Sequence, residues 1–107
     1  MSDLIIKFVF TILASTTLFS GVACAADQQE LYIKSLAASC ANCHGTYGKS
    51  ITDAALPALA GMKSINIIET MQAFKTGTRQ ATIMHQIAKG YSDDQIKLLA
   101  NYFAAQN

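Results

Sequence analysis

The feature that most constrains this chain is a C-x-x-C-H motif, Cys40-Ala41-Asn42-Cys43-His44. At this spacing the two thiols lie on one turn of backbone and can reach two vinyl groups on neighbouring edges of a haem. The histidine that follows then lies beneath the ring and can bind the iron. The motif therefore predicts one covalently bound haem c, held by thioether bonds from Cys40 and Cys43, with His44 as an iron ligand.

Two other uses of a cysteine pair have to be weighed against this interpretation. A thioredoxin-like redox pair needs a β–α–β setting, and the sequence shows no clear strand pattern. A zinc site needs a fourth ligand. Beyond the motif, the mature chain has only His85 and no second cysteine pair to supply one. Haem attachment is therefore the favoured interpretation.

The first 25 residues have the features of a secretory signal peptide. Lys7 provides a positive charge, an uncharged and largely apolar run follows, and Ala23-Cys24-Ala25 matches the small-x-small pattern of a cleavage site. We therefore expect a signal peptide at 1–25 and a mature domain at 26–107. This organisation predicts export to the periplasm, with cleavage near Ala25/Ala26.

Two other interpretations of this segment stay open. The apolar run at 8–22 could remain as a membrane anchor, but it is short for a full span and contains several hydroxyl side chains. Cys24 could become a lipidated first residue, although Gly21 is smaller than the apolar residue usual at such sites. Cleavage is favoured, and it leaves no stable membrane span.

The length and charge of the chain limit its fold and its partners. A chain of 107 residues holds one small domain, and a net charge of +1 provides no basic stripe for nucleic acid. A mature chain this short usually needs a disulfide, a metal or a cofactor to complete its core. A buried haem would supply the missing apolar volume.

Helical patterns dominate the mature chain and predict an all-α domain of about four helices. Asp27, with Glu30 as its capping-box partner, predicts the start of a first helix that ends near Ser39. A long loop at 40–63 follows, punctuated by glycines and by Pro57. Three more helical segments are expected: Ser64 to a stop at Gly77, Ala81 to Lys89, and a last helix opened by a Ser92–Gln95 capping box.

A second axial ligand is expected on the far side of the iron, and methionine is common there in electron carriers. Met71 lies at helical spacing with other apolar residues and is expected in the core, while Met62 could reach the iron only if the long loop folded across it. Met84 is far along the chain from His44, so it can arrive from the opposite side and is the favoured ligand. His85 is the competitor, and is otherwise expected to be an exposed side chain.

Three stretches of the chain together resemble class I cytochromes c. They are C-A-N-C-H-G-T from Cys40, P-A-L-A-G from Pro57, and Met84 followed by I-A-K-G-Y-S. The resemblance implies the class I fold around one haem, with Cys40 and Cys43 as thioethers and His44 and Met84 as iron ligands. It also implies a hydrogen bond from His44 to the backbone near Pro57. Tyr102 or Phe103 is then expected to pack near Ala37.

The C-terminal half is similar, more narrowly, to the cytochrome subunit of flavocytochrome c sulfide dehydrogenase. The similarity rests on M-Q-A-F-K-T-G from Met71, on T-I-M ending at Met84, and on I-A-K-G-Y from Ile87. It implies a flavoprotein (FAD) subunit that oxidises sulfide and passes electrons to this protein, which would hand them to a downstream acceptor. Two features differ from that family: some members have two haem domains, and His85 stands where glycine often follows the methionine.

Two other functions remain in competition. A free diffusible carrier would use a ring of lysines to steer brief encounters, but the basic residues here are few and are balanced by acids, which favours a fixed partner. A haem enzyme or gas sensor needs an open distal position, which Met84 would close. No group of residues indicates hydrolytic or group-transfer chemistry, so no catalytic residue is predicted.

Overall fold

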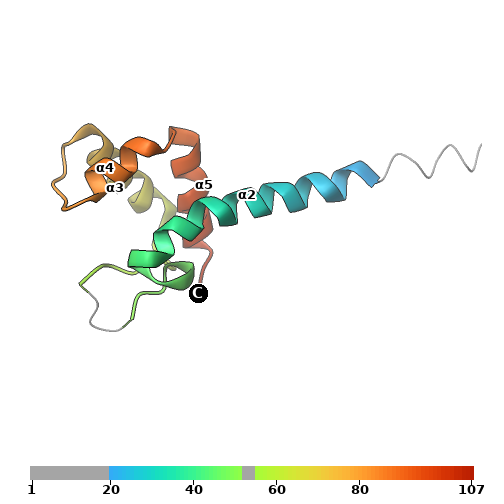
Figure 1. The fold of residues 1–107 in the computed structure, drawn as a ribbon, viewed down its shortest axis with the longest axis horizontal. Coiled ribbons are helices and arrows are strands. Elements are labelled where there is room, and N and C mark those ends of the chain that lie inside the picture. Colours follow the sequence, from blue (N-terminus) through green and yellow to red (C-terminus); the bar gives the residue numbers. More distant parts are fainter. Residues whose placement is uncertain (1–19, 52–54) are drawn as a thin grey trace, which may run out of the picture. The chain divides into compact units, whose positions relative to one another are not determined.

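The computed structural model describes residues 20–51 and 55–107 (Figure 1). Within these ranges the chain forms α-helices and short 3-10 helices and contains no strand, so the predicted all-α class is confirmed. Most of the expected signal peptide lies outside the described residues. None of the helices in the described part is long and apolar enough to cross a membrane. In chain order the elements are α2 (Ser20–His44), η1 (Thr46–Gly48), α3 (Ser64–Thr76), α4 (Met84–Ile87), η2 (Ala88–Gly90) and α5 (Asp93–Ala104).

The chain divides into two compact units, Met1–Leu31 and Tyr32–Asn107. The described part of the first unit, residues 20–31, is helical and forms the beginning of α2. The second unit contains the buried core and all of the predicted haem-binding residues. It is this second unit that carries the site.

The beginning of α2 differs from the prediction. The helix begins at Ser20, so Asp27 lies within it and does not cap it. Three of the seven residues at 20–26 are alanine, which has the highest helix propensity, and no proline interrupts them. The predicted start at Asp27 is therefore wrong: a local capping signal does not by itself begin a helix where the preceding residues are already helical.

The end of α2 also lies beyond its predicted position near Ser39. The helix continues to His44 and stops where Gly45 adopts a φ of 82°, outside the right-handed helical region. No glycine or proline occurs between Ser39 and Gly45, so nothing in the backbone interrupts the helix earlier. The expected loop thus starts five residues later, and the C-x-x-C-H motif lies on the last turns of a helix.

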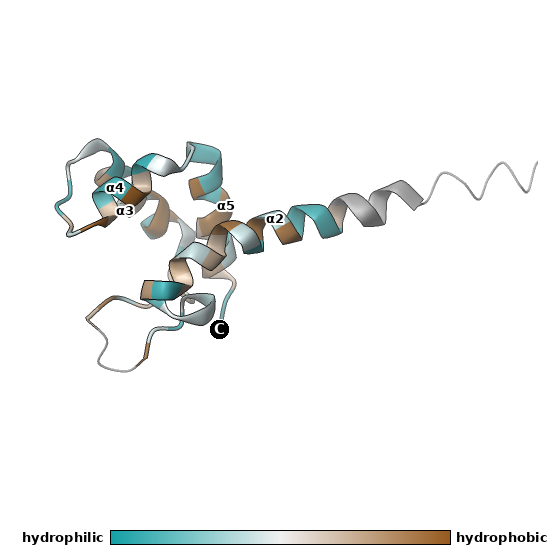
Figure 2. Cartoon of the chain, viewed as in Figure 1, coloured by the Kyte–Doolittle hydropathy of each residue, from teal (hydrophilic) through white to brown (hydrophobic). Residues whose placement is uncertain are grey.

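The core of the second unit is built mainly by α3 and α5, whose hydrophobic residues are visible in Figure 2. Ala37 of α2 shares this buried core with Phe103, as the resemblance implied, and Tyr102 packs against it. Met71 is buried there too, in agreement with its expected role in the core. The buried apolar residues are Ala37, Ile67, Met71, Ala88, Ile96, Leu99, Ala100 and Phe103.

The helix ends in the C-terminal half show which capping signals act. The Ser92–Gln95 capping box is present: the Ser92 hydroxyl accepts from the Gln95 backbone, and the Gln95 side chain accepts from the Ser92 backbone. Gly77 adopts the predicted left-handed stop, with φ 79°. Ser64, by contrast, does not cap α3: it is already the first helical residue, and its hydroxyl donates to Asn101 Oδ1 at 2.7 Å.

Candidate functional site

The two motif cysteines lie three residues apart on the last turns of α2, where side chains at this spacing share one face of a helix. Both are free thiols; Cys40 is half-buried and packs against the core, while Cys43 is exposed. Burial raises the pKa of the Cys40 thiol; the Ser39 hydroxyl opposes this shift and the neighbouring Cys43 adds to it. The pair therefore presents one sulfur at the edge of the core and one at the surface.

His44 is the one buried polar side chain in the described part of the chain, with 8% of its surface exposed. Its Nδ1 atom lies 2.8 Å from the carbonyl oxygen of Pro57. A carbonyl oxygen can only accept, so Nδ1 carries the proton and donates, which leaves the lone pair of Nε2 available to a metal. A backbone carbonyl that accepts from the imidazole nitrogen facing away from the metal is typical of histidines that ligate metals.

The loop between α2 and α3 returns to the end of α2 through contacts at Gly48. The carbonyl oxygen of Gly48 accepts from the backbone N–H of Leu59 at 2.8 Å and of Ala60 at 3.1 Å. Gly61 then donates to the carbonyl oxygen of Phe103 in α5 at 3.0 Å. These bonds fix both ends of the loop, and they place Pro57 within reach of His44.

Met84 is the first residue of α4; its side chain is half-buried and packs against the same core as Cys40. Of the other candidates, Met71 is enclosed by the core and Met62 packs at its margin. His85 is half-buried, which differs from the expected exposed position, and it lines a pocket described below.

The segment that follows Met84 is tied to α3 by polar contacts that the sequence did not reveal. Lys75 Nζ donates to the Tyr91 carbonyl oxygen and to Asp93 Oδ1, each at 2.8 Å. Gln72 Nε2 donates to the same Asp93 oxygen at 3.0 Å, so Gln72, Lys75 and Asp93 form one polar clamp. These contacts lower the pKa of Asp93, through the Gln72 hydrogen bond first and then through the hydrogen bond and charge of Lys75.

A second tie joins this segment to the motif helix. The hydroxyls of Ser39 and Tyr91 lie 2.8 Å apart, and Ser39 directly precedes Cys40. Gln95 Nε2 also donates to the Tyr32 hydroxyl of α2 at 2.9 Å. The two parts of the chain that carry the predicted iron ligands are thus connected through the core and through side-chain hydrogen bonds.

The residues present fit a covalently bound haem. Two free thiols at C-x-x-C spacing, followed by a histidine with a free Nε2, form the donor set that thioether attachment and axial ligation need. Tyr47, Ile51 and Leu56, in the loop that follows the motif, are 55%, 82% and 43% exposed. These large exposed side chains follow the donor set closely in the sequence, and an apolar macrocycle bound there would have apolar surface of this kind to cover.

Comparison with known proteins places this arrangement in a family. The Cytochrome c family matches residues 29–106. The cytochrome subunit of sulfide dehydrogenase from Chlorobaculum tepidum is 46% identical over 69 residues, which are 64% of this chain and 60% of that protein. The thiosulfate dehydrogenase electron acceptor from Thiomonas intermedia is 35% identical over 68 residues, 64% of this chain and 31% of that protein.

A third relative is closer in length. Cytochrome c-554(548) from Halomonas halodenitrificans is 31% identical over 71 residues, which are 64% of this chain and 84% of that protein. The chain spans less than two thirds of the length of the first two relatives. The family match covers the core, the motif and the segment around Met84 together. The chain therefore belongs to the cytochrome c family, electron carriers with covalently bound haem c.

Proposed function

We propose that this protein is an exported carrier with one haem c, held by Cys40 and Cys43, with His44 and Met84 as the iron ligands. Bound there, the haem supplies a one-electron Fe(III)/Fe(II) couple. The observation that carries the assignment is the 2.8 Å hydrogen bond from His44 to Pro57, on a histidine directly after two free thiols. No residue is assigned a catalytic role.

The chain's own residues would tune that couple. The Pro57 carbonyl would hold the imidazole in one orientation, as hydrogen-bond acceptors behind metal-binding histidines do. Met84 as the second iron ligand would raise the reduction potential relative to a second histidine. The polar clamp would hold the Met84 segment in place while the electron enters and leaves, so little reorganisation would be needed.

For the partner, we propose the flavoprotein (FAD) subunit of a sulfide dehydrogenase, with a further acceptor downstream. The 46% identity to the cytochrome subunit of such an enzyme supports this assignment. Ile83 and Ile87, on either side of Met84, are 57% and 37% exposed. Exposed apolar side chains beside an electron-transfer site favour a lasting interface over brief, charge-steered encounters.

A free diffusible carrier is the second candidate. Its support is the match to cytochrome c-554(548), of which this chain covers 84% and whose name mentions no partner. In that case the same haem site would serve successive encounters with separate donors and acceptors.

Retention of a partner on the tagged, haem-loaded protein tests the choice. The protein is recovered from the periplasm of its native cells, and spectra are taken of what it retains. A co-purifying flavoprotein and haem reduction on addition of sulfide are expected. A lone cytochrome that sulfide fails to reduce would contradict the sulfide dehydrogenase assignment and favour the free carrier. The mass of the same material should also place the mature N-terminus near Ala26.

A further inference from the structure

The α4–η2 segment, residues 84–90, begins with the proposed ligand Met84 and has few ties to the rest of the fold. Among the described residues, the hydrogen bonds of residues 80–90 all stay within 80–91. Apolar packing of Met84 and Ala88 against the core joins the segment to the other helices. Hydrogen bonds to other elements therefore begin only at the two ends of this stretch.

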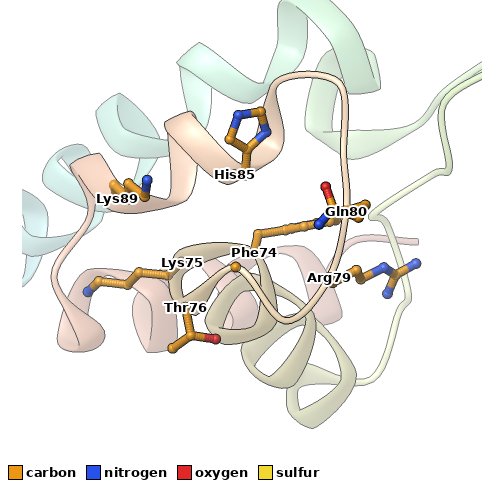
Figure 3. A pocket seen from close by; sticks show the side chains of 8 residues that line it. Phe74, Lys75, Thr76, Arg79, Gln80, His85 and Lys89 are labelled. Carbon is orange, nitrogen blue, oxygen red and sulfur yellow. The ribbon is translucent and has the colours of Figure 1, made fainter.

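Packing of the segment against α3 is incomplete. A pocket of about 220 Å³ lies between the end of α3, the turn after it and the α4–η2 segment (Figure 3). A space of this size is large enough for several water molecules. The segment therefore has room to move on this side, and packing there does not fix its position. The pocket is lined by Phe74, Lys75, Thr76, Gly77, Arg79, Gln80, His85 and Lys89.

Tyr91 directly follows the segment and is bonded on every side. Its backbone N–H donates to the Ala88 carbonyl oxygen at 3.3 Å, and its own carbonyl oxygen accepts from Lys75 Nζ of α3 at 2.8 Å. Its hydroxyl lies 2.8 Å from the Ser39 hydroxyl of α2, and its side chain packs against the core. One residue thus connects the end of the segment to both α2 and α3.

The hydrogen bond between Tyr91 and Ser39 has a defined direction. Ser39 Oγ donates to the Leu36 carbonyl oxygen at 3.0 Å, which uses the only proton of that hydroxyl. The Tyr91 hydroxyl therefore donates and Ser39 Oγ accepts. Ser39→Thr keeps the acceptor oxygen, whereas Ser39→Ala removes it.

Ser39 directly precedes Cys40, so its position is fixed relative to a haem attached at Cys40 and Cys43. We propose that Tyr91 is a positioning residue: its hydroxyl, bonded to Ser39, holds the α4–η2 segment where Met84 can bind the iron. The bond breaks when the segment moves away and opens the second axial position. This inference rests on the proposed function, because it requires Met84 as the iron ligand.

Titration of the ferric, haem-loaded protein with imidazole tests the proposal. Imidazole binds only where Met84 has left the iron, so its apparent affinity is reduced by the fraction of molecules in that open state. Loss of the methionine-to-iron charge-transfer band reports the displacement. Tyr91→Phe and Ser39→Ala should each tighten the apparent affinity about fivefold, which corresponds to about 1 kcal/mol, the net value of one hydrogen bond.

Two further variants show whether the two hydroxyls act as a pair. Ser39→Thr should bind imidazole as the unmodified protein does, because it keeps the acceptor. The double variant Ser39→Ala/Tyr91→Phe should bind no more tightly than either single variant, because both changes remove the same bond. Additive effects in the double variant would overturn the proposal.

Tyr32→Phe is the matched control. The Tyr32 hydroxyl of α2 accepts from Gln95 Nε2 of α5 at 2.9 Å, so this change removes a bond between two helices and leaves residues 80–91 untouched. It should lower the stability to urea and leave the imidazole affinity unchanged. Equal tightening in Tyr32→Phe and Tyr91→Phe would overturn the proposal, because the effect would then be a general loosening of the fold.

Failure of this inference can be distinguished from failure of the proposed function. If the unmodified ferric protein lacks the methionine-to-iron band, Met84 is not the ligand and both are overturned. If the band is present and Tyr91→Phe leaves the imidazole affinity unchanged, only the positioning role of Tyr91 is overturned.

Discussion

The imidazole Nδ1 of His44 and the carbonyl oxygen of Pro57 lie 2.8 Å apart, although the residues are 13 positions apart in the chain. The contact depends on the turn that begins at Gly45 and on Gly48, whose carbonyl accepts two backbone N–H groups from the returning part of the loop. Packing at Gly48 therefore decides whether His44 keeps its acceptor. The predictions below start from that position.

Gly48→Ala should lower the free energy of unfolding by about 2–4 kcal/mol. An added Cβ would lie 2.8 Å from a ring carbon of Phe103 and 2.9 Å from Cβ of Leu59. The backbone also has φ 74°, a conformation that costs a residue with a side chain about 1–3 kcal/mol, and overpacking costs a similar amount. Urea denaturation of the haem-loaded variant measures the loss.

Two other glycines separate the causes of that loss. Gly77→Ala has a similar φ of 79° but nothing within 4 Å of the added atom, so only the backbone cost of about 1–2 kcal/mol is expected. Gly90→Ala has neither problem and should change stability by less than about 0.5 kcal/mol. Equal losses at Gly48 and Gly77 would show that packing against Phe103 contributes nothing.

Replacement of Met84 tests the proposed second iron ligand. Met84→Ala should convert a six-coordinate, low-spin haem spectrum into that of an open or replaced position. It should also lower the midpoint potential by on the order of 100 mV, within the roughly 0.8 V range that axial ligands set. Optical spectra and a redox titration measure both effects.

The controls for Met84 are the other side chains that could bind iron. Met71→Leu preserves the volume of a core residue and should leave spectrum and potential nearly unchanged. His85→Ala should also keep the six-coordinate spectrum. If His85→Ala gave the spectral change and Met84→Ala did not, histidine would be the ligand.

Features that depend on neighbouring residues could be predicted from the sequence. The Gly77 stop and the Ser92–Gln95 capping box are determined within a few positions, and both occur as predicted. The two ends of α2 could not be predicted in this way. The helix already runs through Asp27 from Ser20, so the local capping signal there is not used, and no glycine or proline interrupts the helix between Asp27 and Gly45.

Contacts between distant residues left no signal in the sequence. Ser39 and Tyr91 are 52 positions apart, and Lys75 and Asp93 are 18 apart; each pair meets only because the core brings two elements together. Ser64 illustrates the same effect. Serine favours the N-cap position of a helix, but the Ser64 hydroxyl instead donates a hydrogen bond to Asn101, which is 37 positions away. The donor set at Cys40, Cys43 and His44 is thus a prediction from local chemistry, while tertiary packing determines the contacts that support these residues.

Ser92→Ala should destabilise the protein by about 1 kcal/mol, because it removes the side chain that accepts from the first turn of α5. Ser64→Ala is the matched comparison. It loses one exposed hydrogen bond to Asn101 and no cap, so about 0.5 kcal/mol is expected. Thermal or urea unfolding distinguishes them. A larger loss at Ser64 would mean that its hydroxyl does support the start of α3.

Asp93 makes the stability of the fold depend on acid pH. Its pKa is lowered in the folded chain, by the Gln72 hydrogen bond first and then by Lys75. A carboxyl whose pKa is lower folded than unfolded stabilises the fold above its unfolded pKa of about 3.9, and this contribution is lost as pH falls through the folded value. Asp93→Asn should therefore unfold at lower urea concentration than wild type at pH 7, and the difference should shrink between about pH 4 and pH 2.

Lys75→Met should reduce the same pH dependence, because it removes one of the groups that lower the Asp93 pKa. If the difference between wild type and Asp93→Asn stayed constant down to pH 2, the polar clamp would contribute nothing through the charge of Asp93.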